Sequence, residues 1–231
     1  KPIEKNKIKL KDINAILSKN IYGVDKNKTA VKLSKFSLQL ALCQIVPNNE
    51  LWNWSEEGVF ETVFYDLNNN IIEKDFFDFL IEKKMLHNTF DLVIGNPPFE
   101  SLSKKAYTNY EAKLKATFTF ASKIPDNQLA LMFLEASSLL LKPKGELCFI
   151  QKSTSLLYNN KSEEFRRSLF NQFHVYQIID FTLLKNVLFK SKNSERTDEN
   201  GNVILNKNGT PKKSKATSVE SCAVFYKKEK I

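Results

Sequence analysis

Apolar residues along this chain follow two spacings, one typical of strands and the other typical of helices. Short apolar runs predict six strands, at residues 21–24, 71–75, 92–94, 146–151, 176–181 and 222–226. Helical spacing predicts five helices, over residues 7–18, 27–42, 76–85, 128–141 and 162–173. Strands that alternate with helices are the signature of a parallel sheet wrapped by helices, so we expect an α/β fold.

Three polar stretches interrupt this alternation. Residues 47–69 are rich in Asn and predict a long connection, and residues 100–126 predict a mobile insertion or lid. Residues 190–218 are rich in Lys, Asn and Ser and nearly free of apolar side chains, which predicts a disordered or flexible loop. The 231 residues suffice for one buried core, so we predict a single domain over residues 1–231.

The formal charge of +9 favours a polyanionic partner. The lysines are spread along the chain, so a solvated Lys-rich surface is an equally simple explanation. Cys43, Cys148 and Cys222 lie far apart inside apolar runs and lack metal-ligand spacing. They predict reduced core cysteines in a cytoplasmic protein and no metal site. The sequence carries no signal peptide and no apolar run of membrane-spanning length, so we expect no membrane association.

Asn96-Pro97-Pro98-Phe99 stands directly after the apolar run at residues 90–95, where a buried strand is expected to end. The Asn96 side-chain carbonyl and the Pro97 carbonyl can both accept hydrogen bonds from an exocyclic amino group. The two prolines stiffen the loop, and Phe99 can stack on a planar ring. Hydrogen bonds that draw both N–H groups toward acceptors leave the nitrogen lone pair able to attack an electrophilic methyl group. A rigid strand-end turn is the alternative interpretation.

Together with its preceding strand, this string resembles the catalytic motif of amino-group methyltransferases that use S-adenosylmethionine. It is most similar to the N6-adenine-specific DNA methylases of restriction–modification systems, including fused type IIG enzymes. The resemblance runs from about Asn20 to Tyr226. Its stronger parts are residues 21–25, 70–76 and 129–150, and its looser parts are residues 178–181 and 187–189.

The resemblance implies a class I methyltransferase fold, a Rossmann-like sheet with helices on both faces. The family sheet has seven strands, and the pattern above supplies six. The first strand is missing, with the Gly-rich turn that follows it and holds the methionine part of the cofactor, since no glycine precedes Gly23. We therefore expect an N-terminally truncated fragment that binds S-adenosylmethionine poorly and transfers little methyl by itself. A degenerate, non-catalytic copy of the fold is the alternative.

Ligands of open α/β sheets bind outside the carboxyl ends of the strands, where this chain places acidic side chains. Asp25 can accept hydrogen bonds from both ribose hydroxyls of the cofactor, or it can cap the helix that follows. Asp75 can accept a hydrogen bond from the cofactor's adenine amino group while Phe76 packs on that ring, or the pair can be a surface Asp beside a core Phe. The resemblance favours binding for all three residues. Asp66 is a weaker candidate for the role of Asp75.

A base inside a duplex cannot reach such a pocket, so the resemblance implies double-stranded DNA with a flipped adenine as the substrate. Asn96 and the Pro97 carbonyl would hold N6, and Phe99 would stack on one face of the base. Phe189 is the candidate for the other face, with a hydrophobic loop anchor as its alternative. The methyl group would pass by direct displacement without a metal, and backbone contacts from lysines such as Lys104 and Lys105 would make DNA affinity salt-sensitive.

Other functions remain open at this point. Release-factor glutamine methyltransferases and RNA methylases also use Asn-Pro-Pro-aromatic loops, and a non-catalytic remnant would bind DNA or a partner subunit. The DNA methylase interpretation requires a target-recognition domain or subunit outside this chain. The sequence does not indicate the DNA recognition sequence, the oligomeric state, or the presence of a nuclease domain in the parent protein.

Overall fold

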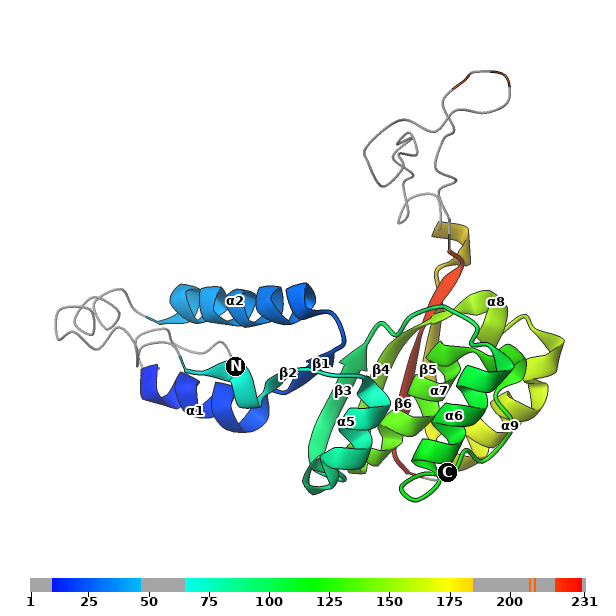
Figure 1. The fold of residues 1–231 in the computed structure, drawn as a ribbon, viewed down its shortest axis with the longest axis horizontal. Coiled ribbons are helices and arrows are strands. Elements are labelled where there is room, and N and C mark those ends of the chain that lie inside the picture. Colours follow the sequence, from blue (N-terminus) through cyan, green and yellow to red (C-terminus); the bar gives the residue numbers. More distant parts are fainter. Residues whose placement is uncertain (1–9, 47–64, 185–207, 209, 211–218, 230–231) are drawn as a thin grey trace. The chain divides into compact units, whose positions relative to one another are not determined.

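The computed structural model describes residues 10–46, 65–184, 208, 210 and 219–229. The chain forms two compact units, Lys1–Glu82 and Lys83–Ile231. The labels in Figure 1 are used for their elements.

The first unit combines a short parallel sheet with helices. Its elements are α1 (Leu10–Asn20), β1 (Gly23–Asp25), α2 (Lys28–Ile45), the 3-10 turn η2 (Leu67–Asn69), β2 (Ile71–Glu73) and α5 (Phe76–Glu82). Strands β1 and β2 run parallel, with Gly23 opposite Ile71 and Asp25 opposite Glu73. Because the strands are parallel, the residues that follow both of them lie at the same edge of this sheet.

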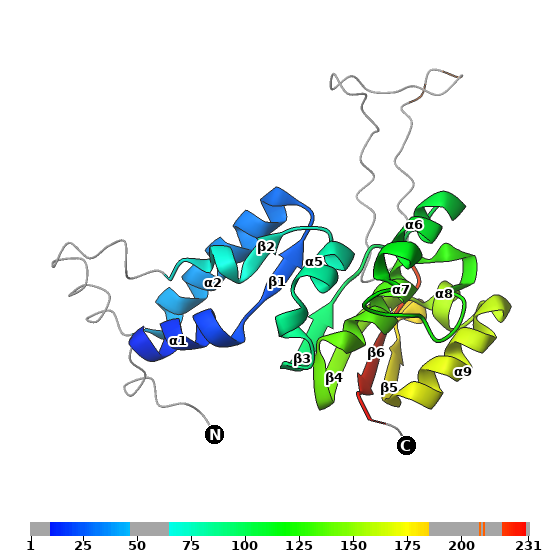
Figure 2. The same cartoon turned by 60° about the horizontal axis from the view of Figure 1, so that its bottom comes forward.

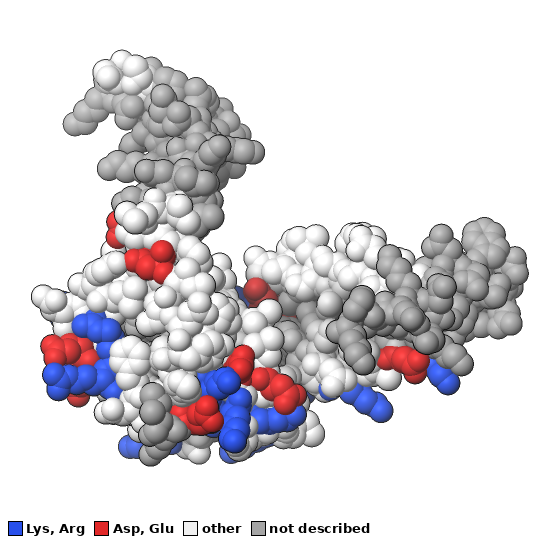
Figure 3. All heavy atoms as spheres, turned by 180° about the vertical axis from the view of Figure 1, so that it is seen from behind, with Lys and Arg blue, Asp and Glu red and all other residues white. Residues whose placement is uncertain are grey.

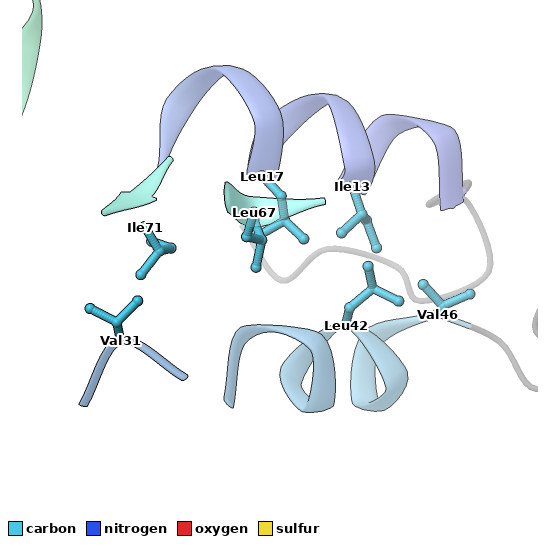
Figure 4. Packing of buried hydrophobic residues seen from close by; sticks show 7 residues of the cluster. All are labelled: Ile13, Leu17, Val31, Leu42, Val46, Leu67 and Ile71. Carbon is cyan, nitrogen blue, oxygen red and sulfur yellow. The ribbon is translucent and has the colours of Figure 1, made fainter. Parts of the chain in front are cut away.

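Apolar side chains between α1 and α2 form the core of this unit (Figure 4). Its buried members are Ile13, Leu17, Val31, Leu42, Val46, Leu67 and Ile71. Ile13 and Leu17 are four residues apart on α1, as a helix needs to present both to one neighbour. The predicted helical spacing is thus confirmed for these two residues, whereas Ile16, which shares the apolar pattern, is exposed.

A buried amide ties the end of α1 to the beginning of β2. The Nδ2 atom of Asn70 donates to the backbone carbonyls of Leu17, Ser18 and Ile21, at 3.3, 2.9 and 3.0 Å. These carbonyls include groups at the carboxyl end of α1 that lack helical partners. Asn70 therefore satisfies buried acceptors that no main-chain donor of the helix can reach.

The second unit is a four-stranded sheet with helices. Its strands are β3 (Phe90–Gly95), β4 (Leu141–Lys152), β5 (His174–Asp180) and β6 (Ser221–Lys227). Its α-helices are α6 (Lys104–Leu114), α7 (Leu129–Ala136), α8 (Ser153–Leu156) and α9 (Glu163–Gln172). Its 3-10 turns are η3 (Lys84–Leu86), η4 (Pro125–Asn127), η5 (Ser137–Leu139), η6 (Asn160–Ser162) and η7 (Thr182–Leu184).

The strand order of this sheet is β3-β4-β6-β5. Strand β3 is parallel to β4, whereas β6 is antiparallel to both β4 and β5. Strands β3, β4 and β5 consequently point in one direction, and their carboxyl ends share one edge. In the described part of the chain, β1, β2, β3 and β5 each pair with one strand.

The helices of the second unit lie on one face of its sheet (Figures 1 and 2). On that face β4 presents buried Leu147, Phe149 and Gln151, and the hydroxyl of Tyr226 from β6 donates to the carbonyl of Leu134 in α7 at 3.0 Å. On the opposite face Ile94 of β3 is 71% exposed. The sequence predicts helices on both faces of the sheet. The helices of this unit cover one face.

All six predicted strands and all five predicted helices are confirmed, within a few residues at their ends. The expectation of a parallel sheet is wrong for β6, which runs antiparallel between β4 and β5. A parallel neighbour needs a crossover, commonly a helix, whereas an antiparallel one does not. The sequence between β5 and β6 carries no helical pattern, which agrees with the observed direction.

Residues 100–126, for which the sequence predicts a mobile insertion or lid, are folded in this structure, and their mobility stays a prediction. This stretch contains α6, and the side chains of Leu114 and Ile124 are fully buried. Their burial fixes both ends of the segment that follows α6. The alternation of lysines with small and polar residues hid these two apolar anchors.

Within the described residues, no helix is long and apolar enough to cross a membrane. The same residues bring together no group of three metal-ligating side chains. Cys43, Cys148 and Cys222 are free thiols, and Cys222 is the one that is buried.

We predict that Asn70→Ala lowers the free energy of unfolding by about 1–3 kcal/mol, because it leaves buried carbonyls without donors. Asn69→Ala is the matched control: Asn69 is the exposed neighbour, and its replacement should change stability by about 0.5 kcal/mol or less. Urea denaturation of both variants measures the difference. Equal midpoints for the two variants would contradict the role given to Asn70.

Candidate active site

The Asn96-Pro97-Pro98-Phe99 loop begins directly where β3 ends, as the sequence predicts. Asn96 and Pro98 are exposed, Pro97 is buried and Phe99 is half-buried. The loop therefore has its first proline anchored in the protein, while the Asn96 amide faces solvent. The carbonyl oxygen of an exposed side-chain amide can accept a hydrogen bond from a ligand's amino group.

Gly95 sets how closely this loop approaches β4. It pairs with Phe149, and a Cβ atom at position 95 would lie 2.9 Å from Cε1 and 3.2 Å from Cζ of the Phe149 ring. Contacts this short are not tolerated without a shift of one partner. The ring of Phe149 is buried and cannot move freely. Because Gly95 has no side chain, the backbone at the end of β3 can lie directly against the Phe149 ring.

The chain that leaves the loop is fastened to the beginning of α7. The amide of Leu129 donates to the carbonyl of Glu100 and the amide of Leu102 to that of Asn127, each at 2.9 Å. Ser101 and Gln128 form an isolated antiparallel bridge, and the Gln128 side chain donates to the Ser101 hydroxyl. The loop is consequently held at both ends, by β3 before Asn96 and by this ladder after Phe99.

A buried carboxylate holds the segment beyond α6. Glu135 of α7 is 1% exposed, and its Oε1 atom accepts a hydrogen bond from the amide of Ala121 at 2.7 Å. Burial raises the pKa of Glu135, and the hydrogen bond from Ala121 opposes that shift. This contact ties the backbone at Ala121 to α7.

Asp25 stands at the end of β1, where the sequence predicts a cofactor contact. Its Oδ1 atom accepts a hydrogen bond from the amide of Asn27 at 2.7 Å. The cap of α2 is Asn27 itself, which accepts hydrogen bonds from the amides of Thr29 and Ala30. Asn27 rather than Asp25 is thus the N-cap of α2, while Asp25 holds the Asn27 amide just before the helix, and its residue remains exposed at the carboxyl end of β1.

Asp75 follows β2 at the same edge, because the amide of Lys74 bonds to the carbonyl of Asp25 at 3.0 Å. The Asp75 side chain accepts hydrogen bonds from the amides of Phe77 and Asp78, at 2.9 and 3.3 Å, so it caps α5. Phe76 is half-buried, and its ring meets that of Phe77 edge to face at 5.4 Å. Asp75 thus has a structural role whether or not it also contacts a ligand.

Asp66 does not belong to this edge. Its side chain caps η2 by accepting from the amide of Asn68, and η2 leads into the amino end of β2. The weaker assignment of Asp66 to the cofactor is therefore wrong, because the carboxyl ends of β1 and β2 lie at the other end of the sheet. The sequence could not distinguish the two ends of so short a strand.

The predicted residues are distributed over both units. Asp25, Asp75 and Phe76 lie in the first unit and residues 96–99 in the second. Phe189, the candidate for the second face of the base, lies outside the described residues, as does nearly all of the loop at residues 190–218. The stacking role of Phe189 stays a prediction.

Charged side chains of both signs lie side by side on the face of the molecule shown in Figure 3. Among the described residues, the structure pairs Lys142 with Asp91 and Arg167 with Glu163, whatever the face on which they lie. Lys104 and Lys105, at the beginning of α6, are exposed, as the sequence predicts. The positive charge of the chain is thus not gathered into one continuous patch on the face shown.

Sequence reasoning missed the residues that hold the Asn96 loop in place, above all Gln128 and Glu135. No local signal marks them, because both lie in a helical pattern and act on a segment more than ten residues away. It also assigned no role to Asp180, which ends β5. Here a signal existed, since Asp180 follows its strand in the same manner as Asp25 and Asp75.

Solved structures of restriction–modification enzymes have the same fold. A nuclease-deletion mutant of the Type ISP enzyme LlaGI in complex with a DNA substrate mimic matches 97% of this chain and 21% of its own, with 16% identity and a TM-score of 0.54. The DrdV–DNA complex matches 95% of this chain and 22% of its own, with 15% identity and a TM-score of 0.54. A modification subunit of a putative type I restriction enzyme from Vibrio vulnificus matches 99% of this chain and 36% of its own, with 13% identity and a TM-score of 0.51.

These likenesses show that the chain shares its fold with restriction–modification enzymes. Among characterised proteins, the type II restriction enzyme and methyltransferase RM.Eco57I of Escherichia coli is 25% identical over 199 residues, 80% of this chain and 19% of that protein. The family model of the Eco57I restriction-modification methylases matches residues 19–189. The chain belongs to the Eco57I restriction-modification methylase family, and it spans about a fifth of the length of this relative.

We predict that Gly95→Ala lowers the free energy of unfolding by about 1–3 kcal/mol, because the new methyl group collides with the Phe149 ring. Phe149→Leu removes the colliding atoms, so the double variant should be more stable than the sum of the two single changes implies. Chemical denaturation of the three variants measures this coupling. If the stability changes of the two single variants simply added in the double variant, the collision with the Phe149 ring would not be the cause of the loss.

Proposed function

We propose that this chain transfers a methyl group from S-adenosylmethionine to the exocyclic N6 of an adenine flipped out of double-stranded DNA, as part of a restriction–modification enzyme. Membership of the Eco57I methylase family supports methyl transfer. The adenine specificity, the flipped base and the cofactor are our inference from the site residues.

The observation that carries the proposal is the placement of Asn96. Its amide is exposed directly at the carboxyl end of β3, in a loop anchored by buried Pro97 and clamped behind Phe99 by the ladder to α7. Such an amide, with the Pro97 carbonyl, can accept both hydrogen bonds of an amino group and orient its nitrogen lone pair. Phe99 is half-exposed and can stack on the base that carries this amino group.

The first unit offers hydrogen-bond acceptors and an aromatic ring that suit the cofactor. Two carboxylates, Asp25 and Asp75, follow neighbouring parallel strands, with Phe76 beside the second. Carboxylates accept hydrogen bonds from ribose hydroxyls and from an adenine amino group, and a phenyl ring packs on a purine. When bound, S-adenosylmethionine supplies the electrophilic methyl group.

In the transfer, the amino nitrogen forms a bond to the methyl carbon as the carbon–sulfur bond breaks, and the nitrogen then releases one proton. Asn96 and Pro97 need only hold the nitrogen in line, so positioning is the main contribution of the protein. No metal takes part in this scheme.

The proposed substrate is DNA, and the proposed partner is a target-recognition domain or subunit beyond residues 1–231. Two structures of similar fold, those of LlaGI and DrdV, contain DNA or a DNA mimic, which supports this choice. We therefore propose testing the full-length protein that contains this chain.

The decisive experiment follows tritiated methyl from S-adenosylmethionine into DNA, tRNA, rRNA and a protein extract. We predict label in DNA as N6-methyladenine, and a loss of at least about 100-fold in rate for Asn96→Ala, as when one positioning hydrogen bond is removed from an active site. Asn171→Ala, at an exposed position of α9, is the matched control and should transfer methyl at the wild-type rate.

Label in RNA or protein would replace the substrate and keep the chemistry. Absence of label from every substrate would favour a non-catalytic, methyltransferase-like remnant. Full activity of Asn96→Ala on DNA would refute the role given to the loop.

We predict that Asp75→Ser separates the two roles of Asp75. Serine is a good helix cap, so stability should change by less than about 1 kcal/mol. The shorter, neutral side chain loses the acceptor for the cofactor, so the affinity for S-adenosylmethionine should fall by about 10-fold. Calorimetry measures both quantities in the full-length protein, and unchanged affinity would restrict Asp75 to capping.

A further inference from the structure

A cluster of hydrogen bonds surrounds the Asp180 carboxylate at the end of β5. Oδ1 of Asp180 accepts from the Ser153 hydroxyl at 2.9 Å, the Thr182 hydroxyl at 2.7 Å and the Thr182 amide at 3.1 Å. Its other oxygen, Oδ2, accepts from the hydroxyl of Tyr158. One carboxylate thereby joins three segments, namely β5, the α8 segment and η7, and we call these four residues the Asp180 cluster.

The Asp180 cluster lies at the same edge of the sheet as the Asn96 loop. Because β3, β4 and β5 point in one direction, the residues that follow them, Asn96, Ser153 and Phe181, leave the sheet on the same side. Two backbone contacts continue the sheet there: the Ser153 amide bonds to the carbonyl of Glu220 at 2.9 Å, and the Phe181 amide to that of Ser221 at 2.8 Å. This edge is the one at which open α/β sheets bind ligands.

Tyr158 is unusual within this cluster, because the residue is 59% exposed although its amide and its hydroxyl are both hydrogen-bonded. Its amide donates to the carbonyl of Ser153 at 3.2 Å, and its hydroxyl donates to Asp180. Leu183 of η7, held by the same carboxylate through Thr182, is 95% exposed. An aromatic ring that is rigidly held yet open to solvent is pre-organised to stack on a ligand.

We propose that Tyr158 is a nucleic-acid contact beside the target base, and that Asp180 is the positioning residue that holds its ring and the η7 turn at this edge. The proposal rests on the proposed function, since it takes the ligand of this edge to be DNA. Exposed aromatic rings stack on unpaired bases whatever their sequence, so the contact would add affinity without reading sequence.

The cluster keeps its charge at every pH at which such an enzyme would be assayed. Hydrogen bonds, first that from the Thr182 side chain and then that from Tyr158, lower the pKa of Asp180 to about 2. Since the pKa is lowered on folding, the stabilising contribution is complete above about pH 4 and is lost as the pH falls through about 2. The same contact with Asp180 raises the pKa of the Tyr158 hydroxyl, which therefore stays a donor.

The test uses the full-length protein and duplexes that contain a site mapped by sequencing DNA methylated by the wild type. We expect Tyr158→Ala to raise the KM for DNA by about 10-fold, the effect of losing one stacked base. Tyr158→Phe and Asp180→Asn should each give a smaller rise, and the double change should be no worse than either single one, because both break the same contact. Affinity for S-adenosylmethionine should stay at the wild-type value in all variants.

Tyr176→Ala is the control, since Tyr176 is an exposed tyrosine near the other end of β5 and should leave the KM for DNA unchanged. Fluorescence of 2-aminopurine at the target position reports whether the base environment changes with the ring. If Tyr158→Ala does not fold, as judged by its cofactor affinity, the pair Tyr158→Phe and Asp180→Asn carries the test.

If the wild type methylates DNA and Tyr158→Ala shows the same KM and the same fluorescence, the inference about Tyr158 is refuted while the proposed function stands. Additive effects of Tyr158→Phe and Asp180→Asn would refute Asp180 as the positioning residue. A wild-type protein that transfers no methyl to DNA would refute the proposed function and, with it, the DNA contact.

Discussion

The parallel pairing of β3 with β4 is the constraint on which the candidate site depends. It places Gly95 against Phe149 and brings the following loop out beside the end of β4. Because β6 runs antiparallel between β4 and β5, β5 also points toward this edge. The ends of β3, β4 and β5 thus share one edge of the sheet. Asn96, Ser153 and Asp180 lie at or directly after these ends, and the strand directions alone bring them to the same side.

Rigidity at this edge comes from polar contacts made behind the exposed groups. Gln128 and the backbone ladder to α7 hold the chain after Phe99, while Glu135 holds the segment beyond α6. Asn70 has the corresponding role in the first unit, where it satisfies carbonyls at the end of α1. Each of these side chains is buried, with Glu135 and Asn70 bonded to the main chain and Gln128 to the Ser101 hydroxyl. Such groups are costly to remove because their partners are left without a hydrogen bond.

The two aspartates of the first unit illustrate how a structural and a binding role can share one position. Asp75 caps α5 through amides of its first turn, and Asp25 bonds to the amide of Asn27. A carboxylate has several acceptor positions, so a backbone contact fixes its orientation without exhausting its capacity. Asp180 extends this pattern to a third strand end, where the carboxylate is engaged by side chains as well.

The sequence by itself determined the strands, most helices and the position of the Asn96 loop, because apolar spacing and turn residues act over a few neighbours. It also placed Asp25 and Asp75 at strand ends, while it misplaced Asp66 and did not predict the helix α6 within residues 100–126. Only the tertiary structure decided the antiparallel course of β6, the clamp between Ser101 and Gln128, and the meeting of Asp180 with Ser153 and Tyr158. These features join residues 20 or more positions apart, and such contacts depend on strand order and packing rather than on any local pattern.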